Sequence, residues 1–414
     1  MAKLGRTLLT VAAAAAAASA QQQQQQQPQD TTQQPEGLHA LMMSAGKEYF
    51  GTATETDNFG DESYQAILAY QGEFGMITPE NSQKWEVTEP RRNHFVYTNA
   101  DAVSEKAQDN GHLLRCHTLT WHSQLPSFVS SGSWNTTTLT SVLTTHITNV
   151  MTHFKGQCYA WDVVNEALNE DGSYRESVFY EVLGDEYIPL SFKTAAEADP
   201  DAKLYYNDFN LETSSKKADG AERIVKLVQE SGARIDGVGF QAHLIVGQTP
   251  SRQTLAALLS RFARLGVEVA WTELDIAHDF SSSSSNGSST ANATQLEQQA
   301  QDYVSVVGAC LDEPKCVGVT VWQFTDKYSW VPSTFPGRGE PCLWTADYKK
   351  KPAYDAVSRL LREAAANNTG VTTTSTTALP SPSSSQGAGV TTRGGSRGGL
   401  LAGVVGLAVA MFVL

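Results

Sequence analysis

Residues 158–166, CYAWDVVNE, have the β-rich composition of a short buried strand, and residues 267–275, VEVAWTELD, repeat that pattern. Six further segments are similar: YFGTATE at 49–55, FGMITPEN at 74–81, HLLRCHTLTW at 112–121, KLYYND at 203–208, GVGFQAH at 237–243 and VGVTVWQF at 317–324. Longer segments with helical spacing of apolar residues separate or follow these strands, at 100–110, 138–154, 177–198, 216–229, 252–265, 293–311 and 352–365.

Eight strand–helix units in one piece of sequence predict an α/β fold, a (β/α)8 TIM barrel that forms a single domain over residues 38–366. An open doubly wound sheet is the alternative. Its dinucleotide-binding form is excluded because no G-x-G-x-x-G motif follows the first strand. The chain has 414 residues, of which 41% are apolar and 18% charged, so it can bury a large core.

The charge balance limits the partners. The formal net charge is −14, from 30 Lys and Arg against 44 Asp and Glu, and the sequence contains no basic block. Such a surface repels a phosphate backbone, so we exclude nucleic acid as a partner. The sequence has no C-x-x-C, no H-E-x-x-H and no cluster of His, so we expect neither a metal site nor a cofactor. We expect a monomer.

Residues 1–20 have the three parts of a secretory signal peptide. Lys3 and Arg6 precede the apolar run LLTVAAAAAAA, and Ala18, Ser19 and Ala20 supply the small residues of a cleavage site. A Gln/Thr-rich low-complexity arm follows at 21–37 without an apolar face, which argues against the alternative of a core helix. The sequence therefore predicts secretion.

The last part of the chain resembles the signal for a glycosylphosphatidylinositol anchor. A Ser/Thr-rich stalk at 367–387 leads to a polar spacer and then to 15 apolar residues, LLAGVVGLAVAMFVL, fewer than the roughly 20 that a spanning helix needs. Gly387 and Ser385 both fit the attachment residue, and residues 388–414 would be removed. A short tail anchor is the alternative. We expect the protein at the outer face of the plasma membrane or cell wall, with membrane contact through the lipid only.

Secretion permits disulfides, and five cysteines leave one unpaired. Cys310 and Cys316 enclose a short loop and form the first expected pair. Cys116 and Cys158 belong to two predicted strands and can pair if those strands are neighbours, which leaves Cys342. Four sequons predict glycans on surface loops, at Asn135, Asn286, Asn292 and Asn367.

Polar side chains gather at the C-terminal ends of the predicted strands, where barrel enzymes carry their catalytic groups. In chain order these are Glu80, Asn81 and Lys84; Asn165 and Glu166; Asn207 and Asp208; Gln241 and His243; and Glu273 and Asp275. Polar groups beside an apolar core cost free energy unless they find partners, so we interpret this end of the barrel as a functional site.

Side chains two or four residues apart share one face of a strand. Three groups are therefore expected to point together into the barrel mouth: Trp271 with Glu273 and Asp275, His117 with Trp121, and Gln241 with His243. Asn165 and Glu166 are adjacent, so both can reach the mouth only if their strand ends there.

Glu166 and Glu273 belong to the fourth and seventh predicted strands and are expected to face each other across the mouth. Two carboxyl groups so placed suit glycoside hydrolysis, in which one protonates the leaving oxygen and the other attacks the anomeric carbon. The alternative is a pair of structural carboxylates in ion pairs, and spacing alone does not separate the two interpretations.

Seven motifs carry a resemblance to a known family. They are WDVVNEAL at 161–168, WTELDI at 271–276, TPENSQKW at 78–85, HTLTWHSQLP at 117–126, YYNDFN at 205–210, GFQAHL at 239–244 and VWQFTDKYSW at 321–330. Together, and following one another along the chain in the family's order, they resemble glycoside hydrolase family 10, the endo-β-1,4-xylanases, over residues 38–361. The pair Gln323-Phe324 departs from the family pattern, in which Gly-Val is commoner.

The resemblance implies that Glu166 is the general acid/base and Glu273 the nucleophile of a retaining mechanism with a covalent glycosyl-enzyme. It implies that Asn165 holds the sugar 2-hydroxyl and that His243, with Asp275 behind it, orients the nucleophile; a structural histidine is the alternative. The implied substrate-binding positions are Glu80, Asn81, Lys84, His117, Trp121, Gln241, Trp322 and Trp330, with Tyr206 and Asn207 in the cleft near the catalytic pair.

The implied substrates are xylan and xylo-oligosaccharides, cleaved at internal β-1,4 bonds. One alternative is a cellulase or mannanase on the same barrel, against which the set Glu80, Asn81 and Lys84 argues. The other is a non-catalytic sugar-binding protein at the cell surface, suggested by the predicted anchor. The presence of both Glu166 and Glu273 argues against it.

Overall fold

The computed structural model describes residues 36–281 and 290–369. The predicted signal peptide, nearly all of the Gln/Thr-rich arm and of the stalk, both candidate anchor residues and Asn286 lie outside these residues. Within them, no helix combines the length and the apolar character needed to cross a bilayer.

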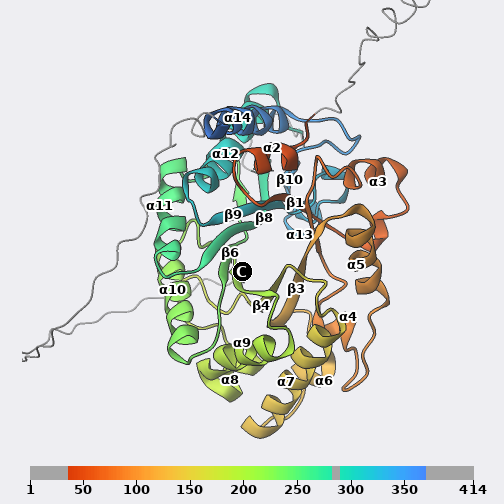
Figure 1. Ribbon diagram of the computed structural model, residues 1–414, viewed down its shortest axis with the longest axis vertical. Helices are drawn as coiled ribbons and strands as arrows, with labels where there is room; N and C mark the ends of the chain where they lie inside the picture. The colour runs from red at the N-terminus through yellow and green to blue at the C-terminus, as the bar shows by residue number, and fades with distance from the viewer. Residues whose placement is uncertain (1–35, 282–289, 370–414) are drawn as a thin grey trace, which may run out of the picture. The chain divides into compact units, whose positions relative to one another are not determined.

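Eight parallel strands form a closed barrel at the centre of the molecule, which confirms the predicted (β/α)8 fold (Figure 1). They are β1 (Tyr49–Thr54), β2 (Met76–Pro79), β3 (Leu113–Trp121), β4 (Ala160–Asn165), β5 (Lys203–Asp208), β6 (Gly237–Phe240), β8 (Glu268–Asp279) and β9 (Cys316–Val321). Pairing of β9 with both β8 and β1 closes the barrel. Two short strands, β7 (His243–Ile245) and β10 (Arg338–Gly339), pair with the C-terminal part of β8.

The helices surround the barrel (Figure 1). The longer ones are α2 (Leu38–Ser44), α3 (Glu62–Leu68), α5 (Thr98–Asn110), α7 (Thr136–His153), α8 (Val178–Leu183), α9 (Tyr187–Ala198), α10 (Ser215–Glu230), α11 (Arg252–Ala263), α12 (Ala293–Asp312) and α14 (Pro352–Thr369). Short turns are α4 (Trp85–Thr88), α6 (Ser127–Ser130), α13 (Val331–Thr334), η1 (Thr56–Asn58), η2 (Gly184–Glu186) and η3 (Asp326–Tyr328). The single helix expected at 177–198 is two helices, because Gly184 adopts a φ of +63° that ends α8.

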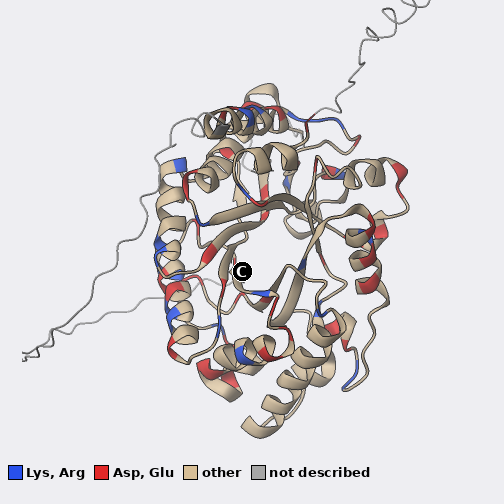
Figure 2. Ribbon diagram, in the orientation of Figure 1, with Lys and Arg blue, Asp and Glu red and all other residues tan. Residues whose placement is uncertain are grey.

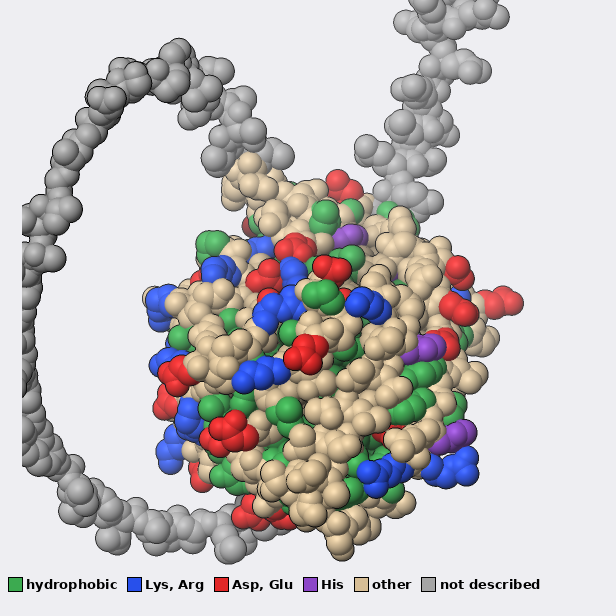
Figure 3. Space-filling view, turned by 60° about the horizontal axis from the view of Figure 1, so that its bottom comes forward, with side chains coloured by type: hydrophobic (Ala, Val, Ile, Leu, Met, Phe, Trp, Pro, Cys, Tyr) green, Lys and Arg blue, Asp and Glu red, His purple; other side chains and the backbone are tan. Residues whose placement is uncertain are grey.

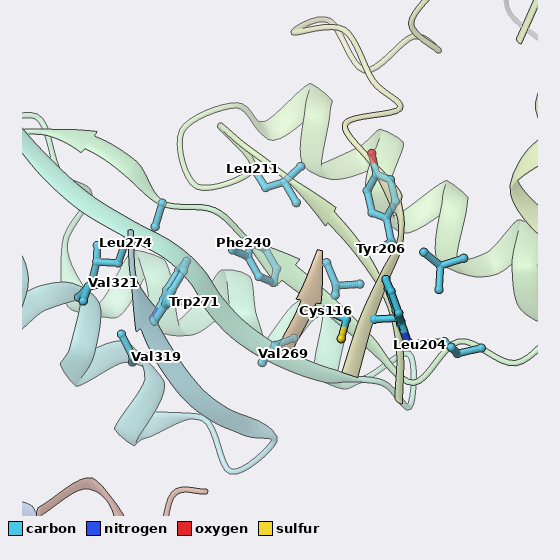
Figure 4. Close-up of a cluster of buried hydrophobic side chains, with 14 of the residues drawn as sticks. Cys116, Leu204, Tyr206, Leu211, Phe240, Val269, Trp271, Leu274, Val319 and Val321 are labelled. Carbon is cyan, nitrogen blue, oxygen red and sulfur yellow. The ribbon is translucent and has the colours of Figure 1, made fainter. Parts of the chain in front are cut away.

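Outward-facing strand residues pack against the helices and form the main core (Figure 4). Trp271 belongs to this core and donates its indole N–H to the carbonyl of Val306 on α12, at 2.9 Å. The expectation that Trp271 points into the mouth with Glu273 is therefore wrong. The pairing of β8 with β9 shifts between Trp271 and Leu274. Because of this β-bulge, Trp271 and Glu273 face opposite sides of β8 although they are two residues apart.

Tyr206 is also a core residue, with no exposed surface, and its hydroxyl donates to Asp208 at 2.5 Å (Figure 4). The expectation that Tyr206 lies in the cleft is wrong for a simple geometric reason. Its neighbour Asn207 faces the barrel interior, and adjacent strand residues face opposite sides.

A separate apolar layer fills the barrel below the mouth. It consists of Tyr49, Met76, Ala160, Tyr205, Ala270 and Val317. Gly237 leaves room for it, because a Cβ at this position would overlap the Tyr205 ring. The layer makes the barrel interior a packed core rather than a channel.

Both expected disulfides are present, Cys116–Cys158 and Cys310–Cys316. The first joins Cys116 in β3 to Cys158, two residues before β4. Strands β3 and β4 are neighbours, as expected, with Cys116 opposite Trp161. Cys342 is buried and unpaired within the described chain.

Two of the predicted glycan sites begin helices. Asn135 and Asn292 are the N-cap residues of α7 and α12, and each side-chain oxygen accepts from a backbone N–H. Asn367 lies in the last turn of α14. The residue after it, Asn368, donates to the carbonyl of Ser44 at 3.2 Å, so the end of α14 lies against the end of α2.

Charged residues lie mainly on the outer helices, for example α5 and α10 (Figure 2). On the face shown in Figure 3, acidic and basic side chains are interspersed and hydrophobic ones are scattered in small groups. That face therefore has no continuous basic surface for a polyanion.

Candidate active site

A cavity of about 750 Å³ lies at the C-terminal ends of the barrel strands. Every residue predicted for catalysis, support or substrate binding lines it, except Tyr206 and Asn207. Those that line it are Glu80, Asn81, Lys84, His117, Trp121, Asn165, Glu166, Gln241, His243, Glu273, Asp275, Trp322 and Trp330. Asn207 is fully buried directly beneath it.

Glu166 reaches the cavity because β4 ends at the residue before it. Its φ is +54°, in the left-handed region that non-glycine residues rarely adopt, so Asn165 and Glu166 escape strand alternation and both line the cavity. The expected strand end is thus confirmed. The Glu166 N–H donates to the carbonyl of Asn207 at 2.9 Å, and Arg175 Nε donates to the carbonyl of Glu166 at 3.1 Å. These contacts hold the unusual backbone in place.

Three donors fix the Glu166 carboxylate. Trp121 Nε1 lies 2.8 Å from Oε2, Gln241 Nε2 lies 3.0 Å from Oε1, and Asn165 Nδ2 lies 3.3 Å from Oε1. Trp121 is the last residue of β3 and Gln241 directly follows β6, so strands on both sides of β4 position the Glu166 side chain.

Glu273 is 5% exposed and has its own set of partners. Asn207 Nδ2 donates to Oε1 at 2.8 Å, and His243 Nε2 lies 3.2 Å from Oε2. Burial alone raises the pKa of Glu273. The hydrogen bond from His243 and the Coulomb interactions with the His117 and His243 rings outweigh it, so the pKa of Glu273 is lowered overall. Glu273 is therefore held as a carboxylate.

His243 lies between two carboxylates. Its Nδ1 is 3.0 Å from Oδ2 of Asp275, which also accepts from Trp330 Nε1 at 2.8 Å. Burial lowers the pKa of His243, but the charges and hydrogen bonds of Asp275 and Glu273 dominate and raise it to about 10. The ring is thus an imidazolium that stabilises the charge of Glu273.

A second set of polar side chains lies on the cavity wall near the end of β2. Gln323 Nε2 donates to Glu80 Oε1 at 2.5 Å, and Gln323 Oε1 accepts from the Tyr64 hydroxyl at 3.1 Å. Burial raises the pKa of Glu80 to about 7. Lys84 Nζ donates to Asn81 at 3.0 Å and to Gln124 at 2.7 Å, and lies 4.8 Å from the Trp121 ring centroid.

His117 is fixed from below by a buried ion pair that the sequence reasoning missed. Its Nδ1 lies 2.9 Å from Asp162 Oδ2, and Arg115 forms a salt bridge with the same carboxylate. Alternation from His117 would have placed Arg115 in the barrel.

Further cavity residues come from loops, from the short turn α13 and from the strands β7, β8 and β10. They are Gln124, Phe209, Asn210, Leu244, Ile245, Ala277, Val331, Thr334, Phe335 and Arg338. Phe209 and Asn210 belong to the motif YYNDFN, which was a usable signal. Phe335 and Arg338 lie more than ten residues beyond the predicted strand 317–324, in its connection to the predicted helix 352–365, so nothing in the strand pattern indicated them.

The described residues contain no group of three or more His, Cys, Asp or Glu side chains placed to hold a metal ion. The chemistry available at the cavity is that of two carboxyl groups, an imidazolium and amides, surrounded by indole rings. A family model described as glycosyl hydrolase family 10 matches residues 37–360. This chain belongs to glycosyl hydrolase family 10.

Relatives within family 10 cover most of the chain. One, from Pyricularia oryzae and named endo-1,4-beta-xylanase 5, is 56% identical over 331 residues, which are 80% of each chain. Another, endo-1,4-beta-xylanase 1 of Humicola insolens, is 54% identical over 325 residues, 78% of this chain and 74% of the relative.

Solved family 10 structures have the same fold. The endo-1,4-beta-xylanase XylE of Penicillium canescens superposes with a TM-score of 0.74 at 40% identity and covers 79% of this chain and 98% of its own. A xylanase from Bispora sp. MEY-1, solved with xylobiose, has a TM-score of 0.74 at 38% identity, covering 78% of this chain and 99% of its own.

Proposed function

We propose that this family 10 protein is a retaining endo-1,4-β-xylanase with Glu166 as the general acid/base and Glu273 as the nucleophile. One observation carries the proposal. The side chain of Asn207 bonds both Asn165, the neighbour of Glu166, at 2.9 Å and Glu273 at 2.8 Å, so a single buried amide ties the two carboxylate strands together beneath one cavity. The relatives' names support the choice of xylan.

The two glutamates divide the reaction between them. Glu273, ionised beside His243, attacks the anomeric carbon while Glu166 donates its proton to the departing glycosidic oxygen. This step leaves a glycosyl ester on Glu273. Glu166, now a carboxylate, then takes a proton from a water molecule while the oxygen of that water attacks the anomeric carbon. Glu273 leaves, and both side chains return to their starting states.

The rest of the cavity suits a chain of neutral sugars. Indole rings of Trp121, Trp322 and Trp330 offer flat apolar faces to pyranose rings. Amide and carboxyl groups from Asn81 and Glu80 can satisfy sugar hydroxyls at the rim.

The test compares substrates side by side. Release of reducing ends should be fast from xylan and slow from carboxymethylcellulose and mannan, with a rapid drop in xylan viscosity that marks internal cleavage. Faster hydrolysis of carboxymethylcellulose or mannan would show that this polymer, and not xylan, is the substrate. Proton NMR of the first product should show the β-anomer, and initial α-anomer would contradict retention.

We further propose that the enzyme is secreted, glycosylated and anchored by lipid at the outer cell surface. The residues that suggest secretion and the anchor, at both ends of the chain, lie outside the described part of the structure, whereas the sequons at Asn135, Asn292 and Asn367 lie within it. Phosphatidylinositol-specific phospholipase C should release active enzyme from membranes. Resistance to the phospholipase combined with release by proteolysis would favour a tail anchor, and protein found only in the medium would exclude both.

A further inference from the structure

Three side chains lie on the cavity wall beside β8, and two of them, Phe335 and Arg338, have no role in the proposed reaction. Trp330, Phe335 and Arg338, here called the aromatic–arginine wall, all line the cavity. The Phe335 ring packs edge-on against Trp330 with centroids 5.4 Å apart, and the Arg338 guanidinium carbon lies 5.1 Å from the Phe335 centroid. Phe335 is 38% exposed and is the one large exposed apolar side chain of the described residues that lines the cavity.

The guanidinium of Arg338 has donors to spare. Its nearest carboxylate, Asp279 Oδ2, lies 3.9 Å from Nε, beyond hydrogen-bond distance. The other Asp279 oxygen accepts from Ser281, at 2.9 Å from N and 2.5 Å from Oγ. Within the described chain no acceptor hydrogen-bonds the guanidinium, and the side chain is 34% exposed.

The charges around the cavity make this position distinctive. Four carboxyl groups line it, those of Glu80, Glu166, Glu273 and Asp275. Of the two Lys or Arg side chains on its described wall, Lys84 already donates to Asn81 and Gln124. The imidazolium of His243 lies between two carboxylates. Arg338 is therefore the cation of the described cavity wall that has free donors for an acidic group on a bound polymer.

We propose that the aromatic–arginine wall binds a uronic acid branch on the xylan chain, an inference that rests on the proposed function. The planar fork of Arg338 would take the carboxylate through two parallel N–H···O bonds. The exposed Phe335 ring would stack against the apolar face of the same sugar. The enzyme would then favour uronate-substituted xylan over the same polymer without its charge.

The test compares two polymers that differ only in charge, glucuronoxylan and glucuronoxylan whose carboxyl groups have been reduced to alcohols. The measured quantity is the ratio of kcat/KM on the acidic polymer to kcat/KM on the reduced polymer. Arg338→Gln should lower this ratio by about 3- to 10-fold, as expected for a partly exposed charge-assisted pair. Arg338→Lys should lower it less, and Arg338→Glu should lower it most, with a loss that added salt reduces.

Arg359→Gln is the matched control, because it makes the same charge change at an exposed position on α14. Its ratio should equal that of the wild type. An unchanged ratio in both Arg338→Gln and Arg338→Glu, with wild-type melting temperatures, would overturn the proposal.

Binding without turnover separates this inference from the proposed function. In a Glu273→Gln background, affinity electrophoresis in gels containing either polymer should show that Arg338→Gln weakens retardation by the acidic polymer selectively. Equal retardation in both gels overturns the uronate site. Selective retardation in a protein whose parent hydrolyses none of the xylans would support the site and overturn the xylanase assignment.

Discussion

Asn207 donates from Nδ2 to Oε1 of Glu273 at 2.8 Å, although Asn207 itself has no exposed surface. The hydroxyl of Thr272 in turn donates to Asn207 Oδ1 at 2.6 Å, which fixes the orientation of the amide. The carboxylate is thereby held from below by a fully buried side chain. This contact leads to the first prediction.

Asn207→Asp replaces a donor to Glu273 with a second carboxylate. A like charge at this distance disfavours ionisation of Glu273, so its pKa should rise. The acidic limb of the kcat/KM profile on a soluble xylo-oligosaccharide should move to higher pH, with a lower maximum. Asn149→Asp, exposed on α7, is the control and should leave the limb in place. An unmoved limb in Asn207→Asp would show that this contact does not govern the nucleophile.

The two glutamates should have different mutational signatures. Glu273→Gln should abolish turnover of every substrate, by roughly 10⁴-fold or more, because no covalent intermediate can form. Glu166→Ala should lower kcat on xylan by about 10²- to 10⁴-fold. It should largely spare aryl xylosides, whose leaving group needs no proton. Near-normal xylan hydrolysis by Glu273→Gln would refute the assignment.

The buried carboxyl group of Glu80 should make stability depend on pH. Its pKa of about 7 in the folded protein exceeds its ordinary value of 4.5, so the folded state binds the proton more tightly. The contribution of Glu80 to stability is therefore greatest below pH 4.5 and is lost as the pH rises through 7. Glu80→Gln removes this loss, so its melting temperature relative to the wild type should increase between pH 4.5 and pH 8.

The control for that measurement is Glu363→Gln, an exposed position on α14. Its difference from the wild type should stay constant over the same range. A constant difference for Glu80→Gln as well would mean that Glu80 titrates alike in the folded and unfolded states.

The two disulfides should contribute unequally to stability. Cys116 and Cys158 are 42 residues apart, whereas Cys310 and Cys316 are 6 apart. The loop-closure entropy of the unfolded chain then predicts losses of about 4 kcal/mol for Cys116→Ser with Cys158→Ser and about 2 kcal/mol for the other pair. Urea unfolding of the two double variants checks the order, and a larger loss from the shorter loop would contradict it.

Much of the barrel could be predicted because each strand combines apolar residues with a polar C-terminal end. The same alternation failed at Trp271, where a β-bulge in β8 changes which side chains face inward. A bulge depends on pairing with the neighbouring strand, and single-sequence patterns do not contain that pairing.

Glu166 and Glu273 were placed correctly at the same end of the barrel because their motifs lie at strand ends. Tyr206 was misplaced because a motif identifies a segment and not the face of each residue in it. Phe335 and Arg338 were missed because they belong to the long connection after β9, and only the pairing of β10 with β8 brings that connection to the cavity.

The hydrogen bond between Asn368 and Ser44 has a consequence for an anchored enzyme. Ser44 lies five residues before β1, at the amino-terminal end of the barrel, and the cavity is at the opposite end. A tether that continues from α14 therefore starts on the face farthest from the catalytic groups. A lipid anchor attached through α14 would thus join the domain away from the cavity, and the point of attachment would leave the passage of a long polymer across the cavity unobstructed.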